Sequence, residues 1–201
     1  APALGHLAGH AVNIDGRTTM VRAADGVGLV SLADALAAGG EEVHRLFRSG
    51  PGPETDRFSA AHHAFATDGV LLRAGRGRRL PGPVLVEFQA TAPGSLALPR
   101  LSLLVEEGAE ASVVLHYRSA DGADLVVVPQ VEVVAAEGAR LLLTLVQQWG
   151  NATRAFGHQT MAVERDASVT FSEAGLGGES ARLHLRIGLD GTGSEARVFG
   201  L

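Results

Sequence analysis

The residues of this sequence that are best suited to chemistry are its histidines, of which there are eight. His158 and His184 stand out, because they lie 21 and 19 residues after Glu137 and Arg165, the starts of two copies of a repeated pattern. Imidazole nitrogens are common ligands of transition metals. If the copies stack, the two histidines come close together. A histidine-based metal-binding module is therefore one hypothesis, although the sequence identifies no third ligand and a structural role is the alternative.

Gln147, Gln148 and Trp149 form a second candidate group, at the end of the longest apolar strand. Trp149 is the only tryptophan of the chain. A polar side chain that points into a packed interior is costly unless it has a partner, so an inward orientation would indicate a function. The alternative is that the strand ends here and emerges into solvent.

An arginine-rich loop at residues 75–79 is a third candidate, with the sequence Gly-Arg-Gly-Arg-Arg. Glycine-rich loops with basic side chains can bind phosphate through backbone N–H groups. The Lys-Ser/Thr that completes a phosphate-binding loop is absent here. We therefore favour a solvated turn beside a strand.

The sequence contains no group of residues typical of an enzyme, and we predict no catalytic residues. It has no Gly-x-Ser-x-Gly motif, and it has no cysteine, which excludes a thiolate nucleophile, a disulfide and a thiolate-bound cluster. A β-helical carbohydrate-active enzyme is the alternative. Such an enzyme needs clustered carboxylates, whereas Glu87, Glu132 and Glu164 are scattered along the sequence.

The composition is that of an ordered globular protein. Of the 201 residues, 46% are apolar and 19% are charged, and the formal net charge is −5. This charge argues against general nucleic-acid binding, and no apolar run approaches the roughly 18 residues that span a bilayer. A soluble, cytoplasmic protein without nucleic-acid or membrane partners is expected.

The elements that must position these side chains are short apolar strands in a repeating pattern. Four turns, at Gly108, Gly138, Asp166 and Gly193, each separate two such strands, and they lie about 27 to 30 residues apart. A period of this length with two strands per repeat favours the stacked coils of a β-helix. A β-sandwich also has short, regularly spaced strands and is the rival interpretation. We predict a mainly β fold with a β-helix core.

The N-terminal part is predicted to be a small α/β region. Residues 11–21 are expected to form two strands around Asp15-Gly16, and Ser31 is expected to cap a short helix. A second helix is expected at 41–48, and a third after Thr55 or Asp56, with Phe58, Ala61 and Phe65 on one face. We divide the chain into an N-terminal region at 1–55, a helix and connecting turn at 56–83, and a β-helix core at 84–201.

The ordered series of motifs resembles the SufB/SufD family, the β-helical scaffold proteins of the Suf iron–sulfur cluster assembly machinery, and is more similar to SufD. The resemblance extends over nearly the whole chain, with His62 as a departure, since the family usually has Asn there. The matching segments, in family order, are Asn13–Arg17, Gly28–Ala37, Asp56–Ala64 with Asp68-Gly69, Pro99-Arg100, Glu107–Ala109, Val146–Trp149 and Leu189–Gly191.

This resemblance implies a non-enzymatic scaffold that pairs with a SufB-type protein and recruits a SufC-type ATPase through a C-terminal domain. It implies that the chain is a fragment that ends before that domain, with an open β-helix and no bound cofactor of its own. It also implies that Arg100, Gln147 and Trp149 occupy interior polar positions, which in the SufB member are linked to sulfur or iron passage. The absence of cysteine argues against such a path in this chain.

Overall fold

Two β-sheets that face each other across an aliphatic core form the main body of the computed structural model, which describes residues 6–39 and 41–201. The strands of the seven-stranded sheet, in spatial order, are β2 (Arg17–Ala23), β1 (Gly9–Ile14), β5 (Val84–Ala90), β8 (Glu110–Ser119), β11 (Arg140–Gln148), β13 (Ser168–Gly175) and β15 (Glu195–Gly200). The strands of the eight-stranded sheet are β3 (Val27–Ser31), β4 (Val70–Ala74), β7 (Arg100–Val105), β10 (Gln130–Ala135), β12 (Thr153–Val163), β14 (Ser180–Leu189), β9 (Leu125–Val127) and β6 (Leu96–Ala97).

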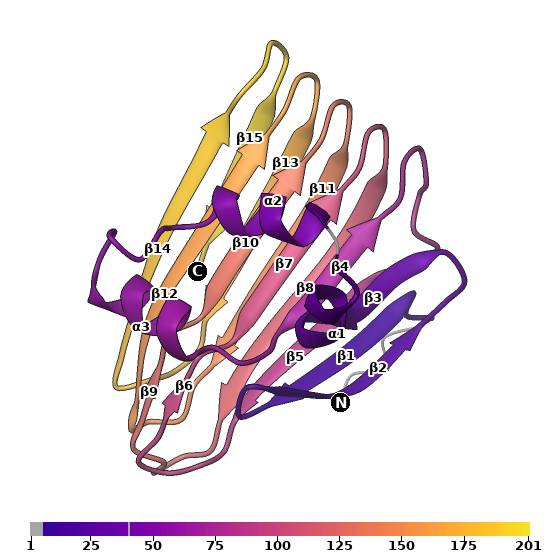
Figure 1. The fold of residues 1–201 in the computed structure, drawn as a ribbon. Coiled ribbons are helices and arrows are strands. Elements are labelled where there is room, and N and C mark those ends of the chain that lie inside the picture. Colours follow the sequence, from indigo (N-terminus) through magenta and orange to yellow (C-terminus); the bar gives the residue numbers. More distant parts are fainter. Residues whose placement is uncertain (1–5, 40) are drawn as a thin grey trace.

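The two sheets are the sides of one solenoid, seen as the ladder of arrows in Figure 1. From β4 onward each strand pairs in parallel with its equivalent one coil later, and the stack has about five coils. One row of paired residues runs from Val70 through Leu101, Val131 and Gln159 to Leu185. This in-register parallel stacking confirms the predicted β-helix and excludes the sandwich, which requires antiparallel sheets.

The solenoid interior is built by the alternation of side chains along each strand. In β11, Leu141, Leu143 and Leu145 are buried in the main core, whereas Leu142 between them is 45% exposed. Successive side chains of a strand point to opposite faces, so every second residue enters the interior. Since equivalent residues stack directly, the interior consists largely of rows of Val, Leu and Ala, and an aromatic pair, Phe88 and Tyr117, stands among them.

The tips of the coils are tight turns that stack on one another. Gly77, Gly108, Gly138 and Gly193 have positive φ angles of 65°, 64°, 67° and 74°, and Asp166 takes the equivalent place with 56°. Glycine adopts this left-handed conformation without steric cost, and Asp tolerates it better than most residues. The loop at 75–79 is therefore the first turn of this stack, consistent with the solvated turn that we favoured.

The N-terminal strands extend both sheets beyond the first coil. β1 pairs in parallel with β5 and antiparallel with β2, and β3 pairs antiparallel with β4. The short helix α1 (Leu32–Ala37) follows, with the Ser31 hydroxyl accepting a hydrogen bond from the Asp34 N–H, as predicted. These strands cover the first edge of the solenoid.

Helices α2 (Glu41–Ser49) and α3 (Arg57–Phe65) lie in front of the eight-stranded sheet, on the outside of the solenoid (Figure 1). We call residues 41–66 the helical strap. Of the face expected for α3, Phe58 stacks on Phe156 of β12, with ring centroids 4.4 Å apart, whereas Phe65 is 68% exposed. Ser59 and His62 are the buried residues of the helix, so it docks with polar side chains as well as with Phe58.

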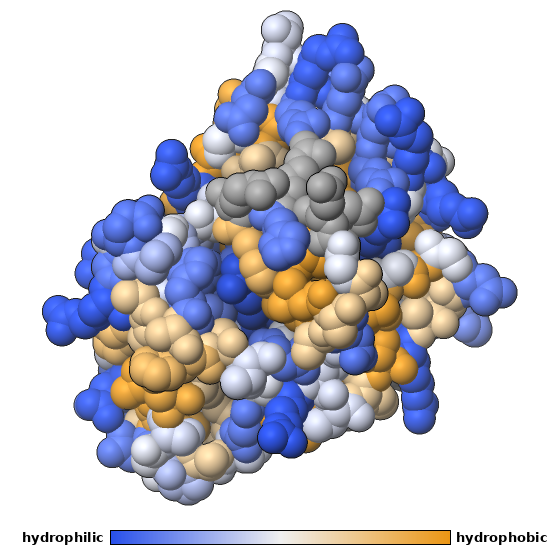
Figure 2. Space-filling view, in the orientation of Figure 1, coloured by the Kyte–Doolittle hydropathy of each residue, from blue (hydrophilic) through white to orange (hydrophobic). Residues whose placement is uncertain are grey.

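The last strands, β14 and β15, leave apolar side chains exposed. Leu189, Val198 and Phe199 are 55%, 53% and 57% exposed. Figure 2 shows the face that carries the strap, where hydrophilic residues dominate the turn tips and apolar residues gather near α2. Within the described residues, no helix combines the length and the apolar character needed to cross a membrane.

Candidate functional site

The parallel register gathers polar side chains into rows on the outer face of the eight-stranded sheet. Arg100 pairs with Gln130, Gln130 with His158, and His158 with His184. Residues two positions further along the strands form a second row, which contains Ser102, Glu132, Thr160 and Arg186. The outward orientation follows from alternation, because the neighbouring residues Leu101, Leu103, Val131 and Val133 belong to the interior core.

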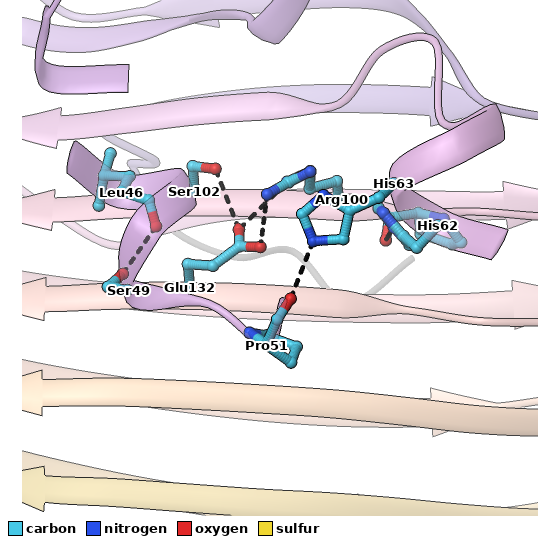
Figure 3. A network of polar contacts seen from close by, with 9 residues as sticks. Leu46, Ser49, Pro51, His62, His63, Arg100, Ser102 and Glu132 are labelled. Carbon is cyan, nitrogen blue, oxygen red and sulfur yellow. Dashed lines mark hydrogen bonds and ion pairs between the residues drawn. The ribbon is translucent and has the colours of Figure 1, made fainter. Parts of the chain in front are cut away.

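A buried ion pair is the centre of this surface. The Arg100 Nη2 lies 2.8 Å from Glu132 Oε1, and the two side chains are only 6% and 0% exposed. The Arg100 Nε donates to Glu132 Oε2 at 3.3 Å, and the Ser102 hydroxyl donates to the same oxygen at 3.1 Å. Figure 3 shows the Glu132 carboxylate pointing towards Ser102 and Arg100. Arg100, Ser102, Gln130, Glu132 and His62 are called the polar cluster below.

The helical strap covers the polar cluster. The Phe47 ring of α2 lies 3.8 Å from Arg100 Cζ, a cation–π contact. A Cβ atom at Gly50, in the linker after α2, would lie 2.7 Å from Glu132 Cγ, so the chain passes directly over the carboxylate and has no room for a side chain there. From α3, the His62 Nε2 donates to the Pro99 carbonyl at 3.2 Å.

Burial decides the protonation of this cluster. Loss of solvent raises the pKa of Glu132, and the nearby Arg100 guanidinium opposes this increase. Burial and then the positive charge of Arg100 lower the pKa of His62 to about 3, so the imidazole is neutral. With Nε2–H donated to Pro99, the Nδ1 of His62 is a buried acceptor without a hydrogen-bond partner among the described residues. The polar cluster therefore combines a buried ion pair with a buried imidazole nitrogen that lacks a hydrogen-bond partner.

The structure brings His158 and His184 side by side, with ring centroids 5.5 Å apart. The His158 Nε2 also lies 3.0 Å from Asp56 Oδ2. The other Asp56 oxygen accepts from the N–H groups of Phe58 and Ser59, as expected of the predicted helix cap. Across the part of the chain that the structure describes, no group of three or more His, Asp or Glu side chains is arranged to hold a metal ion.

Gln147 and Trp149 lie in the solenoid interior, where they are 7% and 3% exposed. The Trp149 Nε1 donates to Gln147 Oε1 at 2.9 Å, and the Gln147 Nε2 donates to Glu173 Oε1. Trp149 also stacks on Tyr117, with ring centroids 5.4 Å apart. Burial raises the pKa of Glu173, and it raises that of Tyr117, whose hydroxyl has no hydrogen-bond partner among the described residues.

Comparison with known proteins places this architecture in a family. Residues 88–201 match the family described as SUF system FeS cluster assembly, SufBD core domain. The chain belongs to the SufBD family. It is 25% identical over 150 residues to an iron-sulfur cluster assembly SufBD family protein of Mycobacterium tuberculosis, covering 75% of this chain and 37% of that protein. A SufBD family protein of Mycobacterium leprae is 24% identical over 151 residues, with the same coverage.

The SufBD match begins near the end of β5, continues to β15 and includes the polar rows on the outer face of the eight-stranded sheet. The helical strap lies before the matched residues. The chain spans 37% of the length of these curated relatives. The family assignment therefore rests on the solenoid and the polar residues on its strands, and not on the helical strap.

The structure corrects the expected place of Arg100. Gln147 and Trp149 are interior residues, but Arg100 is buried on the outside of the solenoid, beneath the helical strap. The odd-numbered residues of β7 enter the core, so an even-numbered one faces outward. In this SufBD chain, Arg100 and Gln147 consequently belong to different sites.

The scattered carboxylates are not brought together. Glu87 lies on the seven-stranded sheet, whereas Glu132 lies on the outer face of the other sheet and is completely buried. Sequence reasoning missed the partners Glu173 and Tyr117 of the interior group and the pairing of Arg100 with Glu132. The register gave a usable signal for that pair, since Arg100 and Glu132 lie at diagonal outward positions of adjacent coils, two residues apart in register.

Proposed function

We propose that this SufBD protein is a non-enzymatic, SufD-like scaffold of iron–sulfur cluster assembly, which acts by contact with a SufB-type protein and a SufC-type ATPase in the cytoplasm. The observation that carries the proposal is the family match over residues 88–201, which covers most of the solenoid. The coarse function, membership of an iron–sulfur cluster assembly family, follows from that match. The SufD-like role and the partners are the proposal.

The architecture is suited to a scaffold for a physical reason. Each coil contacts mainly its neighbours, so stacking gives an extended and rigid surface on which partners can be held at fixed positions. The continuous rows of Val, Leu and Ala in the core support this rigidity. A scaffold needs this positional order rather than a mobile catalytic loop.

In the proposed assembly the SufB-type partner supplies the nucleophile for sulfur transfer. Transfer of sulfur between proteins requires a thiolate as nucleophile. The 201 residues of this chain contain no cysteine and do not supply it. The chain spans 37% of the length of its curated relatives, so the contact with the SufC-type ATPase belongs to the proposal for the whole protein.

Co-expression of the complete protein with a SufB-type and a SufC-type partner tests the proposal. A tag on the complete protein is expected to retain both partners through gel filtration, and iron–sulfur absorbance is expected only when the SufB-type partner is present. Omission of each partner in turn is the control. Separate elution of the three proteins, or a cluster assembled by this protein alone, would contradict the scaffold role.

A further inference from the structure

A cavity of about 460 Å³ lies beyond the polar cluster, between the linker of the helical strap and the last strands of the eight-stranded sheet. Its floor is formed by the outer faces of β12 and β14, and Gly50 and Pro51 lie on its strap side. His158, His184, Thr160 and Arg186 contribute the polar side chains of the floor. A volume of this size is in the range of about 300 to 1,000 Å³ that is usual for small-molecule sites.

The outer face of β14, part of which forms the floor of the cavity, is rich in basic side chains. Arg182, His184 and Arg186 occupy three successive outward positions of β14 and are all exposed. Neither arginine has an ion pair or hydrogen bond within the part of the chain that the structure describes. Most other arginines of the solenoid are paired, for example Arg73 with Glu106 and Arg154 with Asp124. This is a local basic stripe on a chain whose net charge is −5.

The donors of the stripe are spaced to surround one anionic group. Arg186 pairs in register with Thr160, so their Cα atoms are about 5 Å apart and the two side chains leave the same face of the sheet. His184 is two residues from Arg186 on the same face, a separation of about 7 Å. A guanidinium can hold two oxygens of a phosphate at once, and hydroxyl and imidazole donors can bind the others.

Two acidic side chains lie near this place. Asp56 is already held by His158 and by the N–H groups that it caps. Asp190 lines the cavity, and a Cβ atom at Gly188 would lie 3.0 Å from its Oδ1, so its carboxylate lies over that glycine, between Asp190 and Arg186 on the strand. Within the part of the chain that the structure describes, neither carboxylate forms an ion pair with Arg186 or His184.

We propose that this cavity binds the phosphate group of a small ligand, with Arg186 as the principal anchor and His184 and Thr160 as further donors. A free phosphate ion, a pyrophosphate and a nucleotide share this chemistry. The site is on the outer face of the solenoid, so it is separate from the interior residues Gln147 and Trp149.

Titration of the complete protein, followed by NMR of the histidine ring signals and by calorimetry, tests the site. Inorganic phosphate, pyrophosphate and ATP are added separately at constant ionic strength. Saturable binding of at least one is expected, with the His184 signal shifting. The probe that binds most tightly identifies the ligand class: phosphate indicates a free ion, pyrophosphate a diphosphate, and ATP a nucleotide. Each of these results supports the proposal.

Variants decide whether the binding belongs to this cavity. Arg186→Gln is expected to weaken it at least tenfold and Arg186→Lys by less, because lysine keeps the charge but loses the two-oxygen geometry. His184→Ala is expected to weaken it several-fold. Arg118→Gln, on the exposed face of the other sheet, is the matched control and should leave it unchanged. Absence of saturable binding, or equal affinities of wild type, Arg186→Gln and Arg118→Gln, would overturn the proposal.

Discussion

The solenoid interior and the polar cluster are both buried, but they are buried by different means. The interior is closed by strands of adjacent coils and consists of stacked aliphatic rows. The polar cluster lies on the outside of the sheet and is closed by the helical strap, which contributes His62 and covers the other members with Phe47 and Gly50. Burial of the interior therefore depends on the repeated strand pattern, whereas burial of the polar cluster depends on the docking of the strap.

The difference between these regions shows what each contributes to the protein. Apolar burial stabilises by roughly 25 cal/mol per Å², and it needs only suitable size and alternation. A buried ion pair such as Arg100–Glu132 adds little net stability, but it is costly to break because the remaining charge stays without a partner. The cluster thus specifies where the strap lies more than it holds the fold together.

The largest expected effect is loss of one partner of the ion pair. Arg100→Ala should lower the free energy of unfolding at pH 7.5 by about 3 to 5 kcal/mol, since it leaves the Glu132 carboxylate buried and unpaired. The double variant Arg100→Met/Glu132→Leu should remain close to wild type, because an apolar pair replaces both charges. Urea denaturation measures both. Equal destabilisation in the single and double variants would show that packing, not charge, decides the cost.

An interior truncation should cost slightly less and should not depend on a partner. Leu143→Ala removes a completely buried side chain and is expected to cost about 3 kcal/mol. Leu142→Ala on the same strand, where the side chain is 45% exposed, is the control and should cost less than about 1 kcal/mol. Thermal unfolding of the two variants compares them. A similar cost at both positions would mean that the outer face of β11 is covered in solution.

The pH dependence of stability distinguishes the two regions, because the described interior rows contain few titratable groups. The pKa of His62 is about 3 in the folded state and near 6.5 when unfolded, so the unfolded state binds more protons between these values. Stability from this residue is present above pH 6.5 and is lost as the pH falls, by about 1 kcal/mol per pH unit.

His62→Asn should flatten this part of the stability profile, because asparagine does not titrate and can still donate a hydrogen bond to Pro99. Urea denaturation of wild type and variant between pH 7.5 and 4.5 gives the two slopes. His63→Asn, at the neighbouring exposed position, is the control and should leave the wild-type slope unchanged. Parallel profiles of wild type and His62→Asn would show that His62 is accessible to protons in the folded state.

The turn tips belong to neither region and should give the smallest effect. Gly138→Ala places a side chain at φ 67° and is expected to cost about 1 kcal/mol. Asp166→Gly, at φ 56° in the next turn, should change stability by less than about 0.5 kcal/mol, since glycine accepts this conformation. Chemical denaturation detects the difference. If Gly138→Ala costs as much as Leu143→Ala, the turns determine the stacking more than the core does.

The repeated part of the fold could be predicted from the sequence because its signal is local and periodic. The turns at Gly108, Gly138, Asp166 and Gly193 marked the coils, and the same spacing indicated that His158 and His184 would approach each other. The first coil was not recognised as a repeat, since the turn at Gly77 follows a short strand and was interpreted only as a loop. Its positive φ angle shows that it is equivalent to the others.

The helical strap could not be placed from the sequence. The caps at Ser31 and Asp56 were predictable, because each depends on residues within one turn of helix. The docking face of α3 was predictable only in part, since Phe58 of its apolar face makes contact but Ser59 and His62 are buried against residues of distant strands. The outward position of Arg100 follows from the alternation of its own strand, but its burial does not, because the covering residue Phe47 belongs to the strap.

The contact between Phe58 and Phe156 has a consequence for the order in which the molecule assembles. Their stacked rings, 4.4 Å apart, join the strap to the fourth coil, which lies far later in the chain. Consecutive coils can form by local contacts as they become available, whereas this closure must wait for distant residues. During synthesis the strap is therefore complete long before its binding place exists. We expect refolding to show a fast phase for the coils and a slower phase in which the strap docks.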